Sequence, residues 1–248
     1  KERERIIGLL NDIFDVPIDI IDEDGGNKLR IFIRDVERGV SYFRDHKFEY
    51  YRKRGPDPIM YFTGWTTEVK LREKLLRPDE VVYDLGAHIG SWTIPAALVS
   101  KKVYAFEPNI DCCDILRNNL TLNNLNNVEV INIALTGSKK APLIKSCYND
   151  NNTSQWMKLD DVWIDDPPNL IKVDVEGAEL DVIKGARHTI QTFKPRIFVE
   201  AHNLGGEVID GHVIGGHNTY EDIMKTVMEF VPSYNTEVDK GTYCIFTP

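Results

Sequence analysis

Cysteine and long apolar runs are both scarce in this sequence of 248 residues. Its four cysteines, Cys112, Cys113, Cys147 and Cys244, form no CxxC pair and lack the spacing typical of a zinc site. We therefore expect four reduced thiols in a cytoplasmic protein. No apolar run reaches the ~20 residues needed to cross a bilayer, and no signal-peptide core opens the chain, so no membrane span is expected.

Basic residues are also in deficit, with 30 Lys and Arg against 39 Asp and Glu and a net charge of −9. An acidic protein repels a phosphate backbone, so a nucleic-acid partner is not expected. The local basic run at residues 52–54 is read as a solvated face. There is no internal repeat and no low-complexity tract, and the balance of apolar and charged residues is typical of a globular protein.

Residues 1–78 differ in pattern from the rest of the chain. The apolar spacing within residues 6–14 predicts an amphipathic helix, and the alternation over residues 29–33 predicts a strand. A helix over residues 66–76 is expected to end before Pro78. We predict an N-terminal α+β extension that serves either acceptor binding or oligomerisation. The sequence does not determine the oligomeric state, and a homodimer is one of the open alternatives.

Residues 79–248 alternate short apolar runs with helix-like stretches. The expected strands cover residues 81–85, 102–106, 128–133, 170–175 and 195–201, and the expected helices cover residues 91–99, 111–123, 178–192 and 219–230. This alternation predicts a Rossmann-like α/β domain with a mostly parallel sheet covered on both faces. A glycine- and histidine-rich loop precedes the last helix, and a turn at residues 239–241 predicts a C-terminal antiparallel hairpin.

The turn after the first of these strands has the sequence DLGAHIG, starting at Asp84. Doubly wound sheets bind nucleotide-like ligands at such a turn. Ala87 and His88 stand where a GxGxxG fingerprint has its second glycine, which disfavours a pyrophosphate cofactor and an NAD oxidoreductase. S-adenosylmethionine has no phosphate, and Gly86 and Gly90 would let backbone approach it while Asp84 accepts from its amino group. An ordinary strand-to-helix turn is the alternative.

Two further strand ends fit the same ligand. Glu107 follows the second strand about 20 residues after Gly86, where an acidic side chain can accept hydrogen bonds from ribose hydroxyls. Glu107 could instead be an exposed carboxylate that caps the next helix. The third strand ends near the expected adenine position, where Asn132 could hydrogen-bond the ring and Ala134 could pack on it. A plain buried strand is the alternative there.

The fourth strand leads into the block IKVDVEGAE at residues 171–179, continued by LDVIKGA. Other short motifs accompany it: DLGA at residues 84–87, AFEP at 105–108, LDD at 159–161 and PRIFVEAH at 195–202. Together, over about residues 80–203, they resemble the FkbM-type methyltransferases, with the motifs in that family's order. Each motif alone is unspecific, and the combination carries the resemblance.

The resemblance implies a class I methyltransferase fold, with S-adenosylmethionine as the methyl donor. It also implies O-methylation of sugars, glycans or polyketide-type products. The sequence departs from the family at His88, where many relatives carry asparagine, so the protonation of this side chain is expected to affect cofactor binding. Residues 1–78 and those after residue 203 carry no family motif, and these segments are expected to shape the acceptor pocket.

Methyl transfer to a hydroxyl requires that the acceptor be held near the methyl group and that a base remove its proton. The candidates for this role follow two strands: Asp174 and Glu176 come after the fourth strand, and Glu200 and His202 end the fifth. We predict a catalytic role for at least one of Asp174, Glu176 and His202. Glu176 could instead cap the helix that follows it.

A metal ion is not among the expected cofactors. His202, His212 and His217 share one loop, but their spacing is irregular and no cysteine joins them, so a lid or acceptor-binding loop is favoured. Paired carboxylates with His202 or Asn203 could also hold a divalent cation, and this alternative stays open.

These observations predict an S-adenosylmethionine-dependent methyltransferase that acts on an oxygen of a sugar, glycan or other small hydroxylated molecule. One alternative is an RNA methyltransferase, which the acidic net charge disfavours. Another is a non-catalytic scaffold protein that keeps the cofactor fold, which the intact cofactor motifs at Asp84 and Glu107 disfavour.

Overall fold

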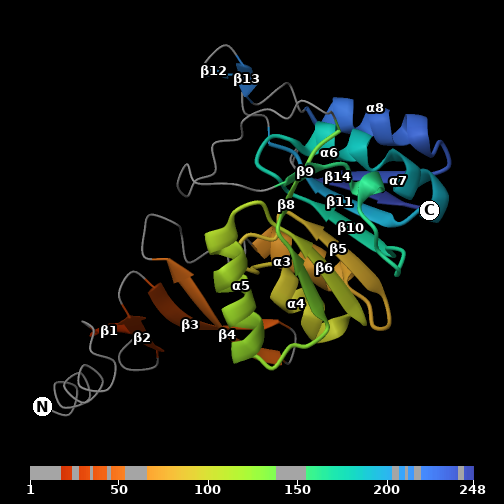
Figure 1. Cartoon of the computed structure of the whole chain (residues 1–248). Coiled ribbons are helices and arrows are strands. Elements are labelled where there is room, and N and C mark those ends of the chain that lie inside the picture. The colour runs from red at the N-terminus through yellow and green to blue at the C-terminus, as the bar shows by residue number, and fades with distance from the viewer. Residues whose placement is uncertain are drawn as a thin grey trace, which may run out of the picture.

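The computed structural model describes the backbone of residues 18–23, 28–33, 36–43, 46–53, 66–137, 155–202, 207–209, 212–214, 219–239 and 243–248. The largest sheet in these residues has seven strands and lies between two groups of helices (Figure 1). In sheet order, its strands are β14 (Asn235–Asp239), β15 (Tyr243–Thr247), β11 (Arg196–Glu200), β10 (Leu170–Val173), β5 (Val81–Leu85), β6 (Lys102–Phe106) and β7 (Val128–Ile131).

Strands β5, β6, β7, β10 and β11 run parallel, and β15 pairs antiparallel with both β11 and β14. The predicted mostly parallel sheet with a C-terminal antiparallel hairpin is therefore confirmed. Because parallel strands point the same way, the turns after β5, β6, β10 and β11 all lie at one edge of the sheet.

Each face of the sheet has its own apolar core, because successive side chains of a strand point to opposite faces. Val82 of β5 packs with one helix group, and Val81, Tyr83 and Leu85 pack with the other. The first group comprises α3 (Thr66–Leu75), α4 (Thr93–Val99) and α5 (Ile110–Leu122). The second comprises α6 (Glu179–Gly185), α7 (Arg187–Phe193) and α8 (Tyr220–Phe230).

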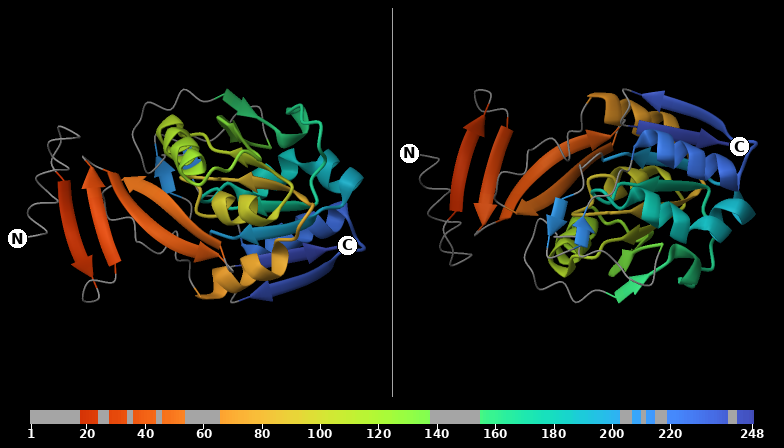
Figure 2. Two further views of the ribbon diagram at one scale, coloured as in Figure 1. Left: turned by 90° about the horizontal axis from the view of Figure 1, so that it is seen from below. Right: turned by 90° about the horizontal axis from the view of Figure 1, so that it is seen from above.

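The N-terminal segment forms a separate four-stranded antiparallel sheet. Its strands are β1 (Ile18–Glu23), β2 (Lys28–Ile33), β3 (Val36–Phe43) and β4 (His46–Lys53). Figure 2 shows this sheet extending away from the main body, with β1 and β2 farthest out. Strand β4 contacts α5, where Asn123 accepts from the backbone N–H of Glu49 at 2.7 Å and donates to its carbonyl at 2.6 Å. Tyr50 is buried in the first core.

Two predicted elements differ from the structure. The helix expected over residues 178–192 is divided at Ala186 into α6 and α7. Gly185 lies so close to the backbone of Thr136 that a Cβ atom would overlap the carbonyl oxygen, so this turn is set by a contact distant in sequence. The strand expected over residues 128–133 stops at Ile131, and the chain continues as β8 (Ile133–Leu135), which pairs with β9 (Gln155–Met157).

Several smaller features complete the description. The 3-10 helix η1 covers Leu159–Asp161, and the histidine-rich segment contains a small hairpin, β12 (Glu207–Ile209) and β13 (His212–Ile214). Among the described cysteines, Cys112, Cys113 and Cys244 are buried free thiols. The predicted helix at residues 6–14 and Cys147 lie outside the described residues. No helix in the described part of the chain is both long enough and apolar enough to cross a membrane.

Candidate active site

The turn after β5 is held between the ends of two neighbouring strands. The backbone N–H groups of Gly86 and Ala87 donate to the carbonyl of Phe106, at 3.0 and 2.9 Å. Gly86 has a φ of +84°, and a Cβ atom at this position would overlap the carbonyl oxygen of Asp174. Only glycine fits this position, because both the backbone conformation and the close approach exclude a side chain.

The same turn continues through two more residues with positive φ. His88 has a φ of +50°, which is uncommon for a residue with a side chain, and its N–H donates to Glu107 Oε2 at 2.8 Å. Gly90 has a φ of +100°, and a Cβ atom there would press on the side chain of Leu116. Helix α4 then begins at Thr93. The turn is therefore a fixed loop of backbone that lies against the carboxylate of Glu107.

Glu107 joins the turns that follow β5 and β6. Its Oε2 accepts from His88, and its Oε1 accepts from the N–H of Asn109 at 2.8 Å. The side chain is 7% exposed. Burial raises the pKa of Glu107 to about 7, although the hydrogen bonds from Asn109 and His88 act in the opposite direction. The structure thus places a carboxylate that titrates near neutral pH beside the glycine turn.

Asn132, between β7 and β8, supports the turn that carries Glu107. Its Nδ2 donates to the carbonyls of Glu107 and Pro108, both at 2.8 Å. Ala134 follows in β8 and is 3% exposed. The expected contacts of Asn132 and Ala134 with an adenine ring stay predictions. In the structure, the amide nitrogen of Asn132 already donates to the turn that carries Glu107.

Asp84 is fully buried at the end of β5 and has two partners in the protein. Its Oδ2 accepts from Thr93 Oγ1 at 2.6 Å, and its Oδ1 lies 3.0 Å from Lys172 Nζ. Lys172 also donates to the carbonyl of Gly86 at 2.8 Å and lies 3.3 Å from Asp174 Oδ2. The predicted contact of Asp84 with a cofactor amino group stays a prediction, because the structure shows this carboxylate paired inside the protein.

The sequence analysis missed the role of Lys172. This lysine is 3% exposed and links Asp84 on β5, Gly86 in the turn and Asp174 after β10. A charged residue inside the apolar strand LIKV was the available signal, because lysine is rarely buried unless it is paired. The residue therefore connects the cofactor turn to the predicted catalytic group.

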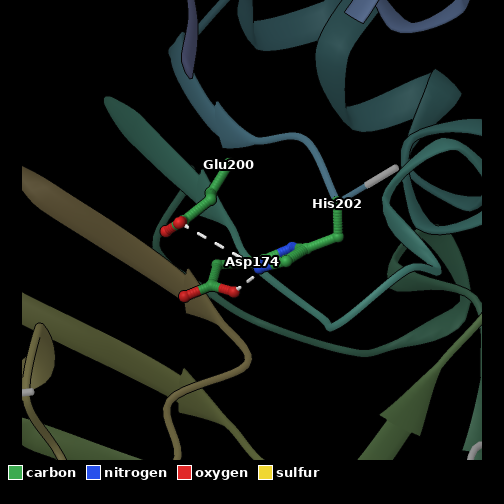
Figure 3. Close-up of side chains that lie close together, drawn as sticks. All are labelled: Asp174, Glu200 and His202. Atoms are coloured by element: carbon green, nitrogen blue, oxygen red, sulfur yellow. Dashed lines mark ion pairs between the residues drawn. The ribbon is translucent and has the colours of Figure 1, made fainter. Parts of the chain in front are cut away.

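The three predicted catalytic residues lie together, with Asp174 and Glu176 on either nitrogen of the His202 imidazole. Nδ1 of His202 lies 3.9 Å from Asp174 Oδ1, and Nε2 lies 3.8 Å from Glu176 Oε2 and 4.0 Å from Glu200 Oε1. Figure 3 shows Asp174, Glu200 and His202 converging from the ends of β10 and β11. The structure thus confirms that these side chains are neighbours, and their catalytic roles stay predictions.

Glu179 is a fourth carboxylate in this cluster, which the sequence analysis did not place there. It is fully buried and accepts from the N–H groups of Val175 and Gly177, at 3.2 and 2.9 Å. Its Oε1 also lies 3.1 Å from Nδ1 of His202, within hydrogen-bonding distance. Glu176, with a φ of +52°, sits at the tip of the loop that Glu179 closes. Glu179 therefore fixes both the loop after β10 and the imidazole.

The carboxylates change the proton affinity of this cluster. Burial lowers the pKa of His202, but the hydrogen bond with Glu179 and the charges of Asp174 and Glu176 outweigh it and raise the pKa to about 9. Burial raises the pKa of Glu176, with additions from Asp174 and Glu179 and opposition from His202. The imidazole is thus a hydrogen-bond donor at neutral pH in this arrangement.

Asp174, Glu200 and His202 also have the donor set of a metal site. Each offers one ligand atom, and the three atoms lie within 4.8 Å of one another. Two carboxylates and an imidazole can hold a divalent cation. The side chains of His212, His217 and Asn203 lie outside the described residues.

A mostly parallel sheet with a glycine turn and a carboxylate at neighbouring strand ends defines a Rossmann-like fold. The model of the FkbM methyltransferase domain matches residues 84–226. The chain belongs to this family. The matched region begins at Asp84 and includes the glycine turn, Glu107 and the His202 cluster.

Two curated relatives are similar to about half of this chain. Hexuronic acid methyltransferase AglP of Haloferax volcanii is 31% identical over 140 residues, which cover 50% of this chain and 56% of that protein. A ribosomal protein L11 methyltransferase of Thermoanaerobacter sp. is 31% identical over 137 residues, covering 50% of this chain and 44% of that protein. The chain spans about half the length of these relatives.

Two solved structures share the fold. The crystal structure of a methyltransferase FkbM from Methylobacillus flagellatus KT gives a TM-score of 0.51 at 21% identity, over 71% of this chain and 49% of that chain. The T. thermophilus 16S rRNA N2 G1207 methyltransferase, in complex with AdoMet and guanosine, gives a TM-score of 0.51 at 13% identity, over 99% of this chain and 61% of that chain. At these identities the likeness concerns the fold.

Proposed function

We propose that this protein is an S-adenosylmethionine-dependent methyltransferase. The observation that carries the proposal is the contact between the glycine turn after β5 and the carboxylate of Glu107 after β6. These two groups lie where doubly wound sheets bind nucleosides. Membership of the FkbM family supports the same cofactor.

The residues of this edge fit the parts of S-adenosylmethionine. Gly86, Ala87, His88 and Gly90 would bring backbone close to the methionyl and ribose groups. The remaining positions of the proposed cofactor site are Glu107 for the ribose hydroxyls, Asn132 and Ala134 for the adenine, and Asp84 for the amino group. Asp84 would act there together with Lys172, its buried partner.

When bound, the cofactor supplies an electrophilic methyl group. The protein has to hold the acceptor oxygen in line with it, exclude water and take up the proton of the hydroxyl. We assign these tasks to Asp174, Glu176 and His202, which meet at the ends of β10 and β11. One of the two carboxylates would take up the proton, and the imidazole of His202 would donate a hydrogen bond that positions the acceptor. Asp174 adjoins the cofactor turn directly, because its carbonyl oxygen leaves no room for a side chain at Gly86.

We propose a hydroxyl of a sugar, glycan or other small molecule as the acceptor. The similarity to a hexuronic acid methyltransferase supports a sugar, and the net charge of −9 disfavours a nucleic-acid backbone. Methylation of a ribosomal protein is the second candidate, favoured by an equal identity to the L11 methyltransferase. An RNA acceptor is the third, and its binding would weaken steeply with salt.

Calorimetric titration with S-adenosylmethionine tests the cofactor assignment. We expect saturable binding that weakens by about 10- to 100-fold in Glu107→Ala, because hydrogen bonds to a charged group contribute about 1.5–3 kcal/mol. Glu129→Gln is a suitable control, since this exposed carboxylate on β7 lies outside the site. Unchanged affinity in Glu107→Ala would remove Glu107 from the cofactor site, and no binding by the unaltered chain would refute the proposal.

An acceptor screen with isotopically labelled methyl donor, followed by mass spectrometry of the product, tests the substrate. The screen contains sugars and glycans, ribosomal protein and bulk RNA as separate arms. Label on an oxygen of a sugar or glycan is the expected result. Label on protein or RNA alone would move the assignment to the second or third candidate.

Once an acceptor is known, variants of the cluster test the catalytic assignment. Asp174→Asn is expected to lower kcat by about 100-fold or more, which is typical for the loss of a positioned proton acceptor. His202→Ala should also lower kcat, because it removes the hydrogen-bond donor that positions the acceptor and the carboxylates. Both variants should change the affinity for S-adenosylmethionine much less, because they face the acceptor. Full turnover in both variants would place the base elsewhere.

A further inference from the structure

Asp174 and Glu200 stand side by side at the end of two paired strands. Val173 of β10 pairs with Val199 of β11 in a parallel register, so the next residue of each strand lies at the same edge. His202 follows two residues after Glu200 and turns its imidazole toward the two carboxylates, as Figure 3 shows. The local chain path therefore brings two oxygen donors and one nitrogen donor to one point.

The spacing of these donors suits a shared ion better than direct hydrogen bonds. Nδ1 of His202 lies 3.9 Å from Asp174 Oδ1 and Nε2 lies 4.0 Å from Glu200 Oε1, and both distances exceed the length of a hydrogen bond. Ligands bind divalent ions at about 2.0–2.3 Å, so two ligands of one ion can be separated by up to about 4.6 Å. One atom from each residue lies within 4.8 Å of the other two, close to this limit.

Glu179 supplies an independent observation. This fully buried carboxylate holds Nδ1 of His202 at 3.1 Å and leaves Nε2 directed toward Glu200 and Glu176. In metal sites, a ligating histidine almost always donates its other ring N–H to a carboxylate or carbonyl, and this hydrogen bond fixes the orientation of the ring. His202 has this arrangement without any side chain needing to move.

The net charge of the cluster also favours a bound cation. The side chains of Asp174, Glu176, Glu179 and Glu200 surround His202, and Nζ of Lys172 lies 3.3 Å from Asp174 Oδ2. Four carboxylates around one imidazole and one ammonium group leave an excess of negative charge. A divalent cation would neutralise it.

We propose that Asp174, Glu200 and His202 bind a divalent cation, with Glu179 as the residue that orients the imidazole. The mixed oxygen and nitrogen donors suit a first-row ion such as Mn²⁺ or Zn²⁺ better than Ca²⁺. Three protein ligands leave coordination positions for water or for a hydroxyl of the acceptor. The catalytic consequence rests on the proposed function: a metal-bound hydroxyl would lose its proton more readily beside the cofactor turn.

The test is a calorimetric titration of the full chain with Mn²⁺ after treatment with a chelator. It uses mildly alkaline buffer, because the ion has to compete with a proton for the imidazole. We expect saturable binding of one ion per chain. Glu200→Gln and His202→Ala should each weaken it by tenfold or more, and Glu179→Gln should weaken it by about 10- to 100-fold. Glu129→Gln, on the exposed side of β7, should bind as the unaltered chain does.

Thermal unfolding of each variant separates a lost ligand from a lost fold, and Glu200→Gln is the decisive variant because its side chain is partly exposed. Absence of Mn²⁺ and Zn²⁺ binding would overturn the inference, as would equal affinity in folded Glu200→Gln and the unaltered chain. A parallel titration with S-adenosylmethionine keeps the two proposals apart. Cofactor binding without metal binding overturns the metal site alone, and metal binding without cofactor binding supports the site and overturns the proposed function.

Discussion

At the scale of single residues, Glu107 accepts hydrogen bonds from two backbone N–H groups and is nearly completely buried. Its hydrogen bonds with His88 and Asn109 favour the ionised carboxylate, whereas burial favours the neutral one. Burial dominates, and the pKa rises to about 7. In the proposed complex, ribose hydroxyls would add further donors to the carboxylate and favour the ionised form.

The affinity for S-adenosylmethionine should therefore depend on pH. Below a pKa of about 7, Glu107 has to lose a proton before it can accept from the ribose, so Kd should rise by about tenfold per pH unit as the pH falls. Above that pKa the affinity should be level with respect to this group. Calorimetry over a pH series on both sides of the pKa measures the effect, and Glu107→Gln should remove it. A dependence that persists in the variant would assign the proton to another group.

At the scale of elements, β5 and β10 are joined by a buried charge pair as well as by their ladder of hydrogen bonds. Lys172 lies opposite Asp84 in the register of the two strands, and both side chains are enclosed. Breaking a buried pair by removing one partner leaves the other charge without compensation. The stability of the central sheet should therefore respond strongly to Lys172.

Lys172→Met is expected to lower the free energy of unfolding by about 3–5 kcal/mol, because it leaves the buried carboxyl group of Asp84 without its cationic partner. Combining it with Asp84→Asn should restore part of this loss, since the amide can still pair with Thr93. Urea unfolding of the two single variants and the double variant measures the coupling. A double variant whose loss equals the sum of the two single losses would show that the two side chains are not energetically coupled.

Most elements of the main sheet could be predicted from apolar periodicity, because their register and burial follow the local pattern. The break between α6 and α7 could not, since it depends on how Gly185 approaches the backbone of Thr136. The same holds for the site. Motifs at strand ends were enough to predict Gly86 and Glu107 as candidates, whereas the contacts of Lys172 depend on partners that are distant in sequence.

At the scale of the whole molecule, we propose that residues 1–78 form an extension and residues 79–248 the methyltransferase domain. The extension would bind the acceptor or a second copy of the chain. The last helix of this segment, α3, packs into the first core through Leu71 and Leu75, and Leu76 follows it there. Arg196 of β11 also donates to the carbonyl of Leu75 at 2.5 Å. The extension is thus tied to the domain at its C-terminal end.

Two shortened chains test this division. A chain that begins at residue 66 keeps α3, and one that begins at residue 79 lacks it. We expect the second to unfold at a lower urea concentration, because each buried leucine contributes about 1.5–3 kcal/mol. A lower midpoint for the shorter chain would show that α3, the last helix of the extension, stabilises residues 79–248, and equal midpoints would contradict this.

The buried thiols offer a way to observe opening of the two sides of the sheet. Cys113 on α5 donates to the carbonyl of Glu107 at 3.3 Å, and Cys244 on β15 lies in the second core. Burial raises the pKa of both thiols to about 12, so each is slow to react with a disulfide reagent until it becomes exposed. Labelling rates at Cys113 and Cys244 can be resolved by peptide mapping. They would therefore show whether a nucleoside ligand slows exposure of the thiol near Glu107 alone or of both thiols.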